Sequence, residues 1–169
     1  MAAVRSAGFV VFRRSTSDNQ CEYLILQASY GKKHWGPPKG KNLINFTCLL
    51  SWSASVVAGK VKDGETVEEA ALRETWEESG FAASQLRRVD GFRRDIDYRV
   101  RGYTKRVTYF LAELIEPEAD VSLSSREHVA FKWATLSDVK KTVKYRDIAS
   151  VIRAAHELIA ATVPHDCKV

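Results

Sequence analysis

The sequence predicts a single domain of the α/β class, and three observations support this class. The chain has 169 residues, a usual size for one domain and enough to bury a hydrophobic core. Hydrophobic residues make up 45% and charged residues 28% of it, which excludes a disordered or a fibrous chain. Hydrophobic patterns typical of strands and of helices follow one another along the chain, without an internal repeat.

The first predicted elements are two strands joined by a polar turn. Residues 6–13 and 22–27 are rich in Val, Phe, Leu and Ile, and the residues between them are mostly polar. Gly and Pro interrupt residues 32–41, which predicts a loop. Residues 42–59 contain no charged side chain, an abrupt change of composition.

A helix is predicted after the uncharged segment. Thr66 and Glu69 have the spacing of a capping box, which marks a helix start, and Gly80 is placed to end the helix. Apolar residues at helical spacing predict a closing amphipathic helix over residues 146–162. The other predicted elements are strands at 88–98, 106–114 and 129–133 and a short helix from residue 136.

The cysteine content indicates the redox compartment of the protein, and the net charge indicates the kind of ligand that it binds. Cys21, Cys48 and Cys167 are too few and too scattered for a disulfide framework, so we expect a reducing compartment. Residues 1–14 lack the long apolar run of a secretory signal. The net charge of +5 suits a polyanionic ligand and leaves nucleic acid, phosphoinositide, nucleotide and anionic membrane open.

Three carboxylates share one side of the predicted helix. At about 100° per residue, Glu77 lies about −60° and Glu78 about 40° from Glu74. A hard divalent cation such as Mg²⁺ offsets their repulsion, because it takes carboxylate oxygens together with water and substrate phosphates. Arg73 is placed to orient a carboxylate by a charge-assisted hydrogen bond. A solvated acidic face is the alternative interpretation.

The spacing of fixed residues over 59–81 resembles the Nudix box of the Nudix hydrolases. The residues that carry the resemblance are Gly59, Glu65, Arg73, Glu74, Glu77, Glu78 and Gly80. Thr75 occupies a slot where aliphatic residues are common. The resemblance implies one Nudix domain over residues 1–169, with a mixed β-sheet sandwiched between α-helices. It also implies Mg²⁺- or Mn²⁺-dependent cleavage of a nucleoside diphosphate linked to another group.

Segments outside the box indicate which group of Nudix hydrolases the chain resembles. Residues 34–40 (HWGPPKG) and 125–133 (SREHVAFKW) are similar to segments of animal-type asymmetric diadenosine tetraphosphate hydrolases. This similarity implies a dinucleoside polyphosphate substrate cleaved to ATP and AMP, with no DNA and no membrane as partner. We expect a monomer in the cytoplasm, and also in the nucleus. The alternatives are a Nudix hydrolase of capped RNA or diphosphoinositol phosphate, and a nucleotide-binding module disabled by an insertion.

The resemblance also implies roles for individual residues. The metal ligands are the backbone carbonyl of Gly59 and the carboxylates of the box, and the bound metal lowers the pKa of an attacking water. Glu77 or Glu127 is the general base, since this role differs among Nudix enzymes. The implied set is Gly59, Glu74, Glu77 and Glu78 for the metal, Arg73, Glu77 and Glu127 for catalysis, His34, Lys39 and Lys105 for phosphate, and Tyr98 and Phe131 for stacking on adenine. Core packing is the favoured interpretation of Trp133.

Residues 41–59 interrupt the resemblance. Gly40-Lys41 recurs as Gly59-Lys60, and removing 41–59 joins PPKG directly to KVKDGE. We therefore interpret this segment as an insertion that arises from alternative splicing, an unremoved intron or an error in the gene assignment. It is short and polar for a membrane span, and its apolar residues favour aggregation or partner binding.

Deleting residues 41–59 is expected to raise soluble yield and to raise kcat/KM for diadenosine tetraphosphate by about tenfold or more. Lys39 and Gly59 act in one site only if the residues between them loop out, at a closure cost of about a few kcal/mol. An apolar loop beside the site can misplace Lys39, which lowers the rate. Side-by-side assays of both proteins measure the effect. Equal activity and yield would show a harmless surface loop, and a less active deletion would make the segment part of the site.

Overall fold

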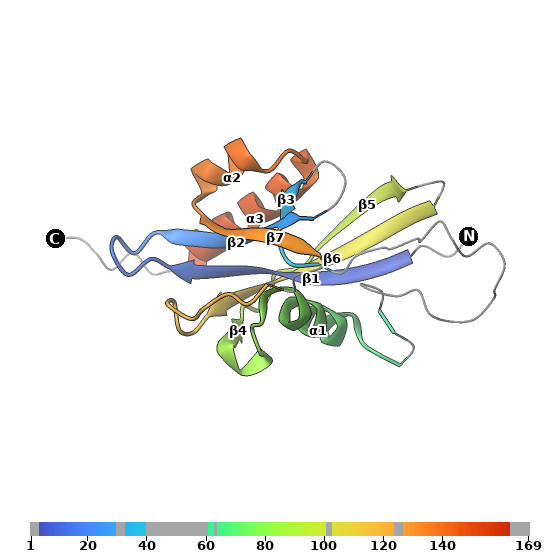
Figure 1. Ribbon diagram of the computed structural model, residues 1–169, viewed down its shortest axis with the longest axis horizontal. Coiled ribbons are helices and arrows are strands. Elements are labelled where there is room, and N and C mark those ends of the chain that lie inside the picture. Colours follow the sequence, from blue (N-terminus) through green and yellow to red (C-terminus); the bar gives the residue numbers. More distant parts are fainter. Residues whose placement is uncertain are drawn as a thin grey trace.

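A mixed seven-stranded sheet forms the middle layer of the protein. The computed structural model describes residues 4–29, 33–39, 61–62, 64–100, 103–123 and 127–162. The strands are β1 (Val4–Arg14), β2 (Cys21–Ala28), β3 (Trp35–Gly36), β4 (Leu86–Arg88), β5 (Arg94–Val100), β6 (Tyr103–Leu114) and β7 (His128–Ala134). The helices are α1 (Val67–Ser79), α2 (Leu136–Thr142) and α3 (Arg146–Thr162), with a 3₁₀ turn at Ala83–Gln85. Figure 1 shows α1 on one face of the sheet and α2 and α3 on the other. The predicted sandwich of a mixed sheet between helices is confirmed.

The strands β1 and β2 diverge soon after the turn that joins them. Their antiparallel pairing runs only from Phe12 opposite Tyr23 to Arg14 opposite Cys21. Beyond it, β1 continues parallel to β6, while β2 pairs with β7 and with the short β3. This divergence separates the two halves of the sheet at the end where the functional residues gather.

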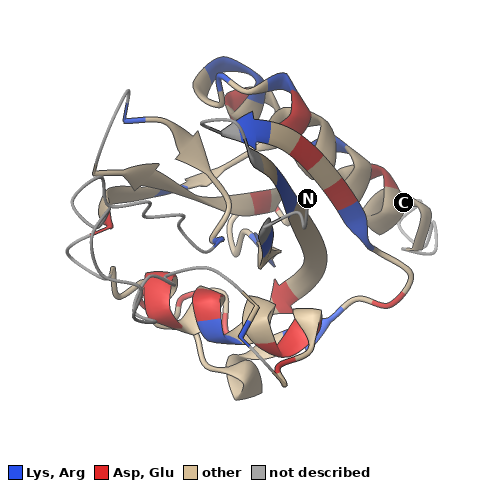
Figure 2. Ribbon diagram, turned by 90° about the vertical axis from the view of Figure 1, so that its right-hand side faces the viewer, with Lys and Arg blue, Asp and Glu red and all other residues tan. Residues whose placement is uncertain are grey.

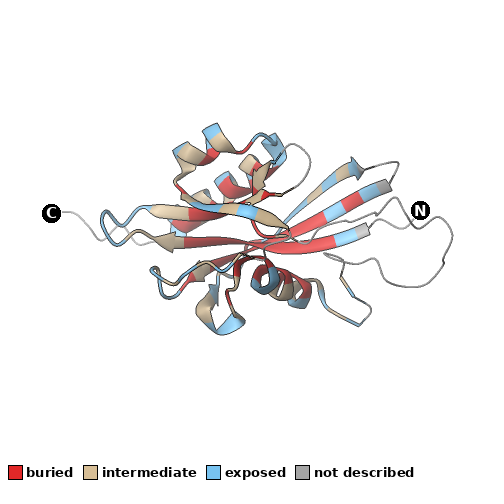
Figure 3. Cartoon of the chain, in the orientation of Figure 1, coloured by how far each residue is buried: buried red, intermediate tan, exposed pale blue. Residues whose placement is uncertain are grey.

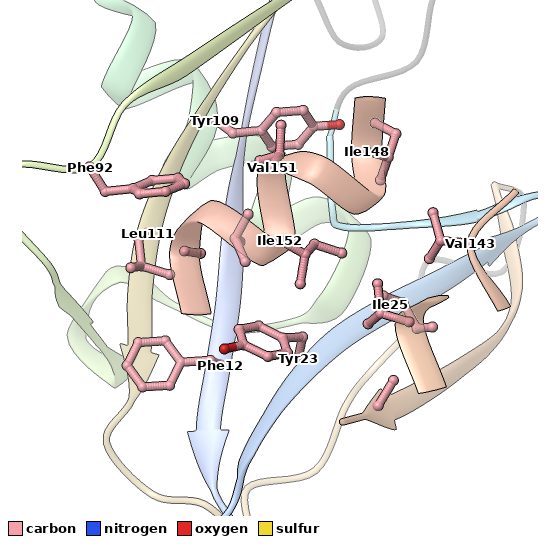
Figure 4. Close-up of a cluster of buried hydrophobic side chains, with 14 of the residues drawn as sticks. Phe12, Tyr23, Ile25, Phe92, Tyr109, Leu111, Val143, Ile148, Val151 and Ile152 are labelled. Atoms are coloured by element: carbon pink, nitrogen blue, oxygen red, sulfur yellow. The ribbon is translucent and has the colours of Figure 1, made fainter. Parts of the chain in front are cut away.

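Alternate side chains of β1 build a core on each face of the sheet. Phe9 and Val11 belong to the buried cluster that includes Ala70 of α1. Val10 and Phe12 belong to the opposite cluster, which packs against α3 and is drawn in Figure 4. The central strands are accordingly buried on both faces (Figure 3), as expected for a sheet between two helical layers.

One predicted strand is wrong in its extent. Residues 88–98 do not form a continuous strand, because a turn at Gly91, with φ +79°, separates β4 from β5. Both strands pair with β6, β4 with residues 112–114 and β5 with residues 103–109. The Val89 N–H still donates to the Leu111 carbonyl at 2.9 Å, so only residues 90–93, around the turn, leave the ladder. The two-residue strand β3 lies inside the segment predicted as a loop, and the other predicted elements are confirmed with small changes at their ends.

The predicted start and end of α1 are confirmed. The Glu69 N–H donates to Thr66 Oγ1 at 3.1 Å, and the Thr66 N–H donates to Glu69 Oε2 at 2.8 Å. Gly80 ends the helix with φ +81°, and its N–H donates to the carbonyl of Trp76 at 2.8 Å. A Cβ at Gly80 would lie 2.8 Å from Ser122 Cβ, so the helix ends against that segment. These two ends set the direction in which the glutamates of α1 project.

A close backbone approach at Gly8 holds residues 37–39 against β1. A Cβ on Gly8 would lie 2.1 Å from the carbonyl oxygen of Pro38 and 3.0 Å from the Cα of Lys39. A side chain at this position would have to displace backbone, which cannot yield as a flexible side chain does. Gly8 therefore positions Lys39, a role that nothing in the sequence pattern indicates.

Gly8→Ala is expected to lower the free energy of unfolding by about 1–3 kcal/mol, because the added methyl group overpacks a backbone contact. Urea denaturation followed by circular dichroism measures the change. Gly36→Ala is the matched control, since the nearest atom to its Cβ is Ile148 Cγ2 at 3.8 Å, an ordinary contact. An unfolding free energy for Gly8→Ala equal to that of the control would contradict the steric argument.

Candidate active site

Glu74 and Glu78 are the buried carboxylates of α1. Both residues are 3% exposed, and they lie one helical turn apart. The backbone N–H of Lys39 donates to Glu78 Oε2 at 2.7 Å, which joins α1 to the segment held by Gly8. Burial raises the pKa of both carboxyls, and the nearby charge of Glu127 raises it further. Two like charges are therefore held close together with little access to water.

Arg73 connects the glutamates of α1 with the loop before the helix. Its Nε and Nη2 donate to the two carboxylate oxygens of Glu65, at 2.8 and 3.1 Å. Its Nη1 donates to Glu74 Oε1 and, at 3.3 Å, to Glu77 Oε2. The hydrogen bonds to Glu65 contribute most to raising the pKa of the Arg73 guanidinium. The charge-assisted bonds predicted for Arg73 are thus present.

An open pocket of about 580 Å³ lies beside these carboxylates. Its lining residues are Glu74, Trp76, Glu77, Glu78, Gly80, Ser122, Leu123 and Glu127. The structure thus brings Glu127, which begins the turn into β7, to the three glutamates of α1 that line the pocket. Red segments recur along this helix in Figure 2, where it lies below the sheet. The side chain of Glu77 is 42% exposed, in contrast to its two buried neighbours.

A second, smaller pocket shares Glu78 and Glu127 with the first and adds basic residues. His34 and Lys39 line it, so two of the residues predicted to bind phosphate adjoin the carboxylates. Lys105, the third, is 3% exposed on β6. Burial, followed by the charge of Lys39, lowers the pKa of Lys105 to about 7. Burial also lowers the pKa of Lys39, against the opposing effect of Glu78.

Two tyrosines lie beside the basic residues. Tyr98 is the cross-strand partner of Lys105, and burial raises its pKa to about 12. Tyr145 is 50% exposed, and its ring meets the His34 ring edge-on with 5.4 Å between centroids. The sequence pattern did not indicate Tyr145 as a site residue. It lies in the link between α2 and α3, where no periodicity marks it, and its aromatic character is the one available signal.

Phe131, the other residue predicted to stack on adenine, lies apart from this cluster. Phe131 is 43% exposed on β7 and is not among the residues that line either pocket. Trp133 packs as expected for a core residue, with its ring 6.3 Å from that of Phe81 and under the guanidinium of Arg13. Gly59 and the rest of 41–59 lie outside the described residues.

The donor chemistry of the first pocket fits a hard divalent cation. Among the described residues, no three His, Cys, Asp or Glu side chains converge closely enough to hold a metal ion alone. Mg²⁺ needs only one or two carboxylates and completes its shell with water and substrate phosphate oxygens. Glu74 and Glu78 meet this requirement, because they are two buried, mutually repelling carboxylates that line an open pocket. A cation between them would offset the cost of their charge.

The fold and this acidic pocket define the class of protein. A family model described as the NUDIX domain matches residues 3–155, and the chain belongs to the NUDIX domain family. Members of this family generally use divalent metal ions.

Individual relatives cover nearly the whole chain. The bis(5'-nucleosyl)-tetraphosphatase (asymmetrical) of Mus musculus is 34% identical over 164 residues, which cover 95% of this chain and 98% of the relative. The protein of the same name from Caenorhabditis elegans is 34% identical over 157 residues, 93% of this chain and 97% of the relative. A crystal structure of a C. elegans Ap4A hydrolase binary complex matches with a TM-score of 0.77 and 33% identity, covering 94% of this chain and 99% of that one. No described helix is long and apolar enough to cross a membrane.

Glu74→Gln is expected to raise the melting temperature of the metal-free protein by a few degrees at about pH 7.5. The pKa of Glu74 is raised on folding, so its contribution to stability is complete below the pKa of the unfolded chain and is lost as the pH rises through the folded-state pKa. The neutral amide avoids this loss, and the difference between the proteins shrinks as the pH falls toward about 4.

Thermal melts in EDTA and in MgCl₂ test this expectation. A divalent cation should raise the melting temperature of the wild type more than that of Glu74→Gln, because binding to the folded state stabilises it. Glu157→Gln on α3 is the control, since the Glu157 side chain is 70% exposed and lies outside the acidic pocket. A melting temperature for Glu74→Gln that equals or falls below the wild-type value in EDTA would contradict the argument.

Proposed function

We propose that this protein is a Mg²⁺-dependent pyrophosphohydrolase that cleaves diadenosine tetraphosphate with water to ATP and AMP. The observation that carries the proposal is the 34% identity to the mouse asymmetrical tetraphosphatase over 95% of this chain. The acidic pocket beside a basic one supplies the chemistry that such a reaction needs, since the reaction acts on a polyphosphate with a metal ion.

The basic residues bind the phosphate chain. Lys39 and His34 line the pocket that Glu78 also lines, and the charges of Lys39, Glu78 and Glu74 act on the pKa of Lys105. Burial lowers the pKa of Lys105 to about 7. The negative charge of an incoming polyphosphate favours the protonated form of Lys105. Substrate binding therefore increases the positive charge that holds the phosphates. Tyr98 and Tyr145, beside His34, offer their rings to one adenine.

The carboxylates divide between metal binding and proton transfer. Glu74 and Glu78 would hold the cation, and Arg73 orients Glu74 by a hydrogen bond. When bound there, Mg²⁺ would supply Lewis-acid chemistry at a phosphoryl oxygen and would lower the pKa of a water. Glu77 or Glu127 takes a proton from the attacking water as its oxygen bonds to phosphorus. The bond from that phosphorus to the bridging oxygen breaks, and the oxygen leaves with the other nucleotide.

The domain organisation is part of the same proposal. Residues 41–59 are an insertion within one NUDIX domain, whose flanks join the same structural unit. The Lys39 N–H is bound to Glu78 of α1, and the Val61 N–H donates to the carbonyl of Arg5 on β1 at 3.3 Å. Both flanks are thus attached to β1 and α1 by their own contacts.

Glu78→Gln is expected to lower kcat by about 100-fold or more, because it removes charge from a buried metal ligand. Glu127→Gln should lower kcat less if Glu127 supports the site without being the sole base. Chromatographic separation of the nucleotides formed from diadenosine tetraphosphate and Mg²⁺ measures both rate and product identity. Glu157→Gln, on the exposed face of α3, is the control.

Separate outcomes of these assays test the identity of the products, the assignment of Glu78 as a metal ligand and the identity of the general base. Formation of two ADP molecules would contradict asymmetric cleavage. Near-full activity of Glu78→Gln at saturating Mg²⁺ would contradict its assignment as a ligand. Complete loss in Glu127→Gln together with a mild effect in Glu77→Gln would assign the base to Glu127.

A further inference from the structure

Trp76 is an exposed aromatic residue on the acidic helix. It is 56% exposed, the highest value among the large hydrophobic residues that the structure describes as exposed. It lines the same pocket as the four glutamates, with Leu123 as the other large apolar residue there. Among the described residues no other ring stacks on it. Its indole therefore offers a flat apolar surface to a ligand in that pocket.

The two pockets provide for the two ends of a dinucleotide. The smaller pocket adds His34 and Lys39 to the shared carboxylates, and the His34 ring contacts Tyr145, whereas the charged residues described in the lining of the pocket with Trp76 are all carboxylates. Asymmetric cleavage of a dinucleoside tetraphosphate breaks a bond next to one nucleoside monophosphate. The metal-binding carboxylates must then lie near that end, with the three phosphates of the other product on the basic residues. The second base is consequently expected in the acidic pocket, which Trp76 lines.

We propose that Trp76, with Leu123 beside it, stacks on the adenine of the half that leaves as AMP. This assignment rests on the proposed function and adds to it a second base-binding site. Stacking on an aromatic ring tolerates every base, because each base has a π-face. The second base is therefore weakly selected, and dinucleotides that differ only there are turned over at similar rates.

The test compares two substrates and three variants. Trp76→Ala should lower kcat/KM for diadenosine tetraphosphate by about 10- to 100-fold, and Trp76→Phe should stay within about threefold of wild type. Adenosine 5'-tetraphosphate lacks the second nucleoside. Its conversion to ATP and phosphate places its one adenine in the tyrosine site and should be unchanged in Trp76→Ala. Ile115→Ala, an exposed apolar residue that lines neither pocket, is the control.

A fluorescence titration measures the stacking without turnover. AMP should quench wild-type tryptophan emission, and this quenching should disappear in Trp76→Phe. Equal loss on both substrates in Trp76→Ala, no loss on either, or equal quenching in both proteins would overturn the assignment. Failure of the wild type to cleave diadenosine tetraphosphate would instead refute the proposed function, and the AMP titration alone would then decide the role of Trp76.

Discussion

The hydrogen bond from the Lys39 N–H to Glu78 is the contact on which the arrangement of the site depends. It crosses the region where β1 and β2 diverge and joins the helix of carboxylates to the segment of basic residues. That segment reaches Glu78 because Gly8 leaves room for the Pro38 backbone against β1. A glycine, a backbone amide and a carboxylate thereby place opposite charges side by side.

The site that this contact joins contains several ionisable groups that are buried at a cost in free energy. Glu74, Glu78 and Lys105 are each 3% exposed. Burial raises the pKa of the two carboxyls and lowers the pKa of the lysine, so it favours the neutral form of all three groups. Such a cluster costs stability in the empty protein, and a cation and a polyphosphate offset that cost when they bind. Arg73 stabilises the acidic residues of the site by hydrogen bonds to three carboxylates. The basic residues are instead stabilised by the phosphates of the substrate when it binds.

Local signals in the sequence predicted α1 well, and contacts distant in sequence explain what was missed. The capping box and Gly80 define the helix within the chain itself, so the common side of Glu74 and Glu78 follows from helical spacing. The contrast between buried Glu78 and exposed Glu77 depends on the packing of residues 37–39, which spacing cannot reveal. Tyr145 reaches His34 through the packing of α2 and α3. The break between β4 and β5 was marked by Gly91 and by a change of phase in the apolar alternation, from Val89 before the turn to Phe92 and Ile96 after it, and the prediction of one strand overlooked both signals.

The parallel pairing of β1 with β6 has a consequence for how the chain folds during synthesis. Each residue of β1 meets a partner about 100 residues later, so the most buried strand emerges from the ribosome long before its neighbour does. Until residue 114 is available, the β1–β2 hairpin exposes apolar side chains on both faces, and α1 has no completed sheet to cover. Folding must therefore wait for the second half of the chain, and chaperones that shield nascent hydrophobic strands are most useful to this protein in that interval.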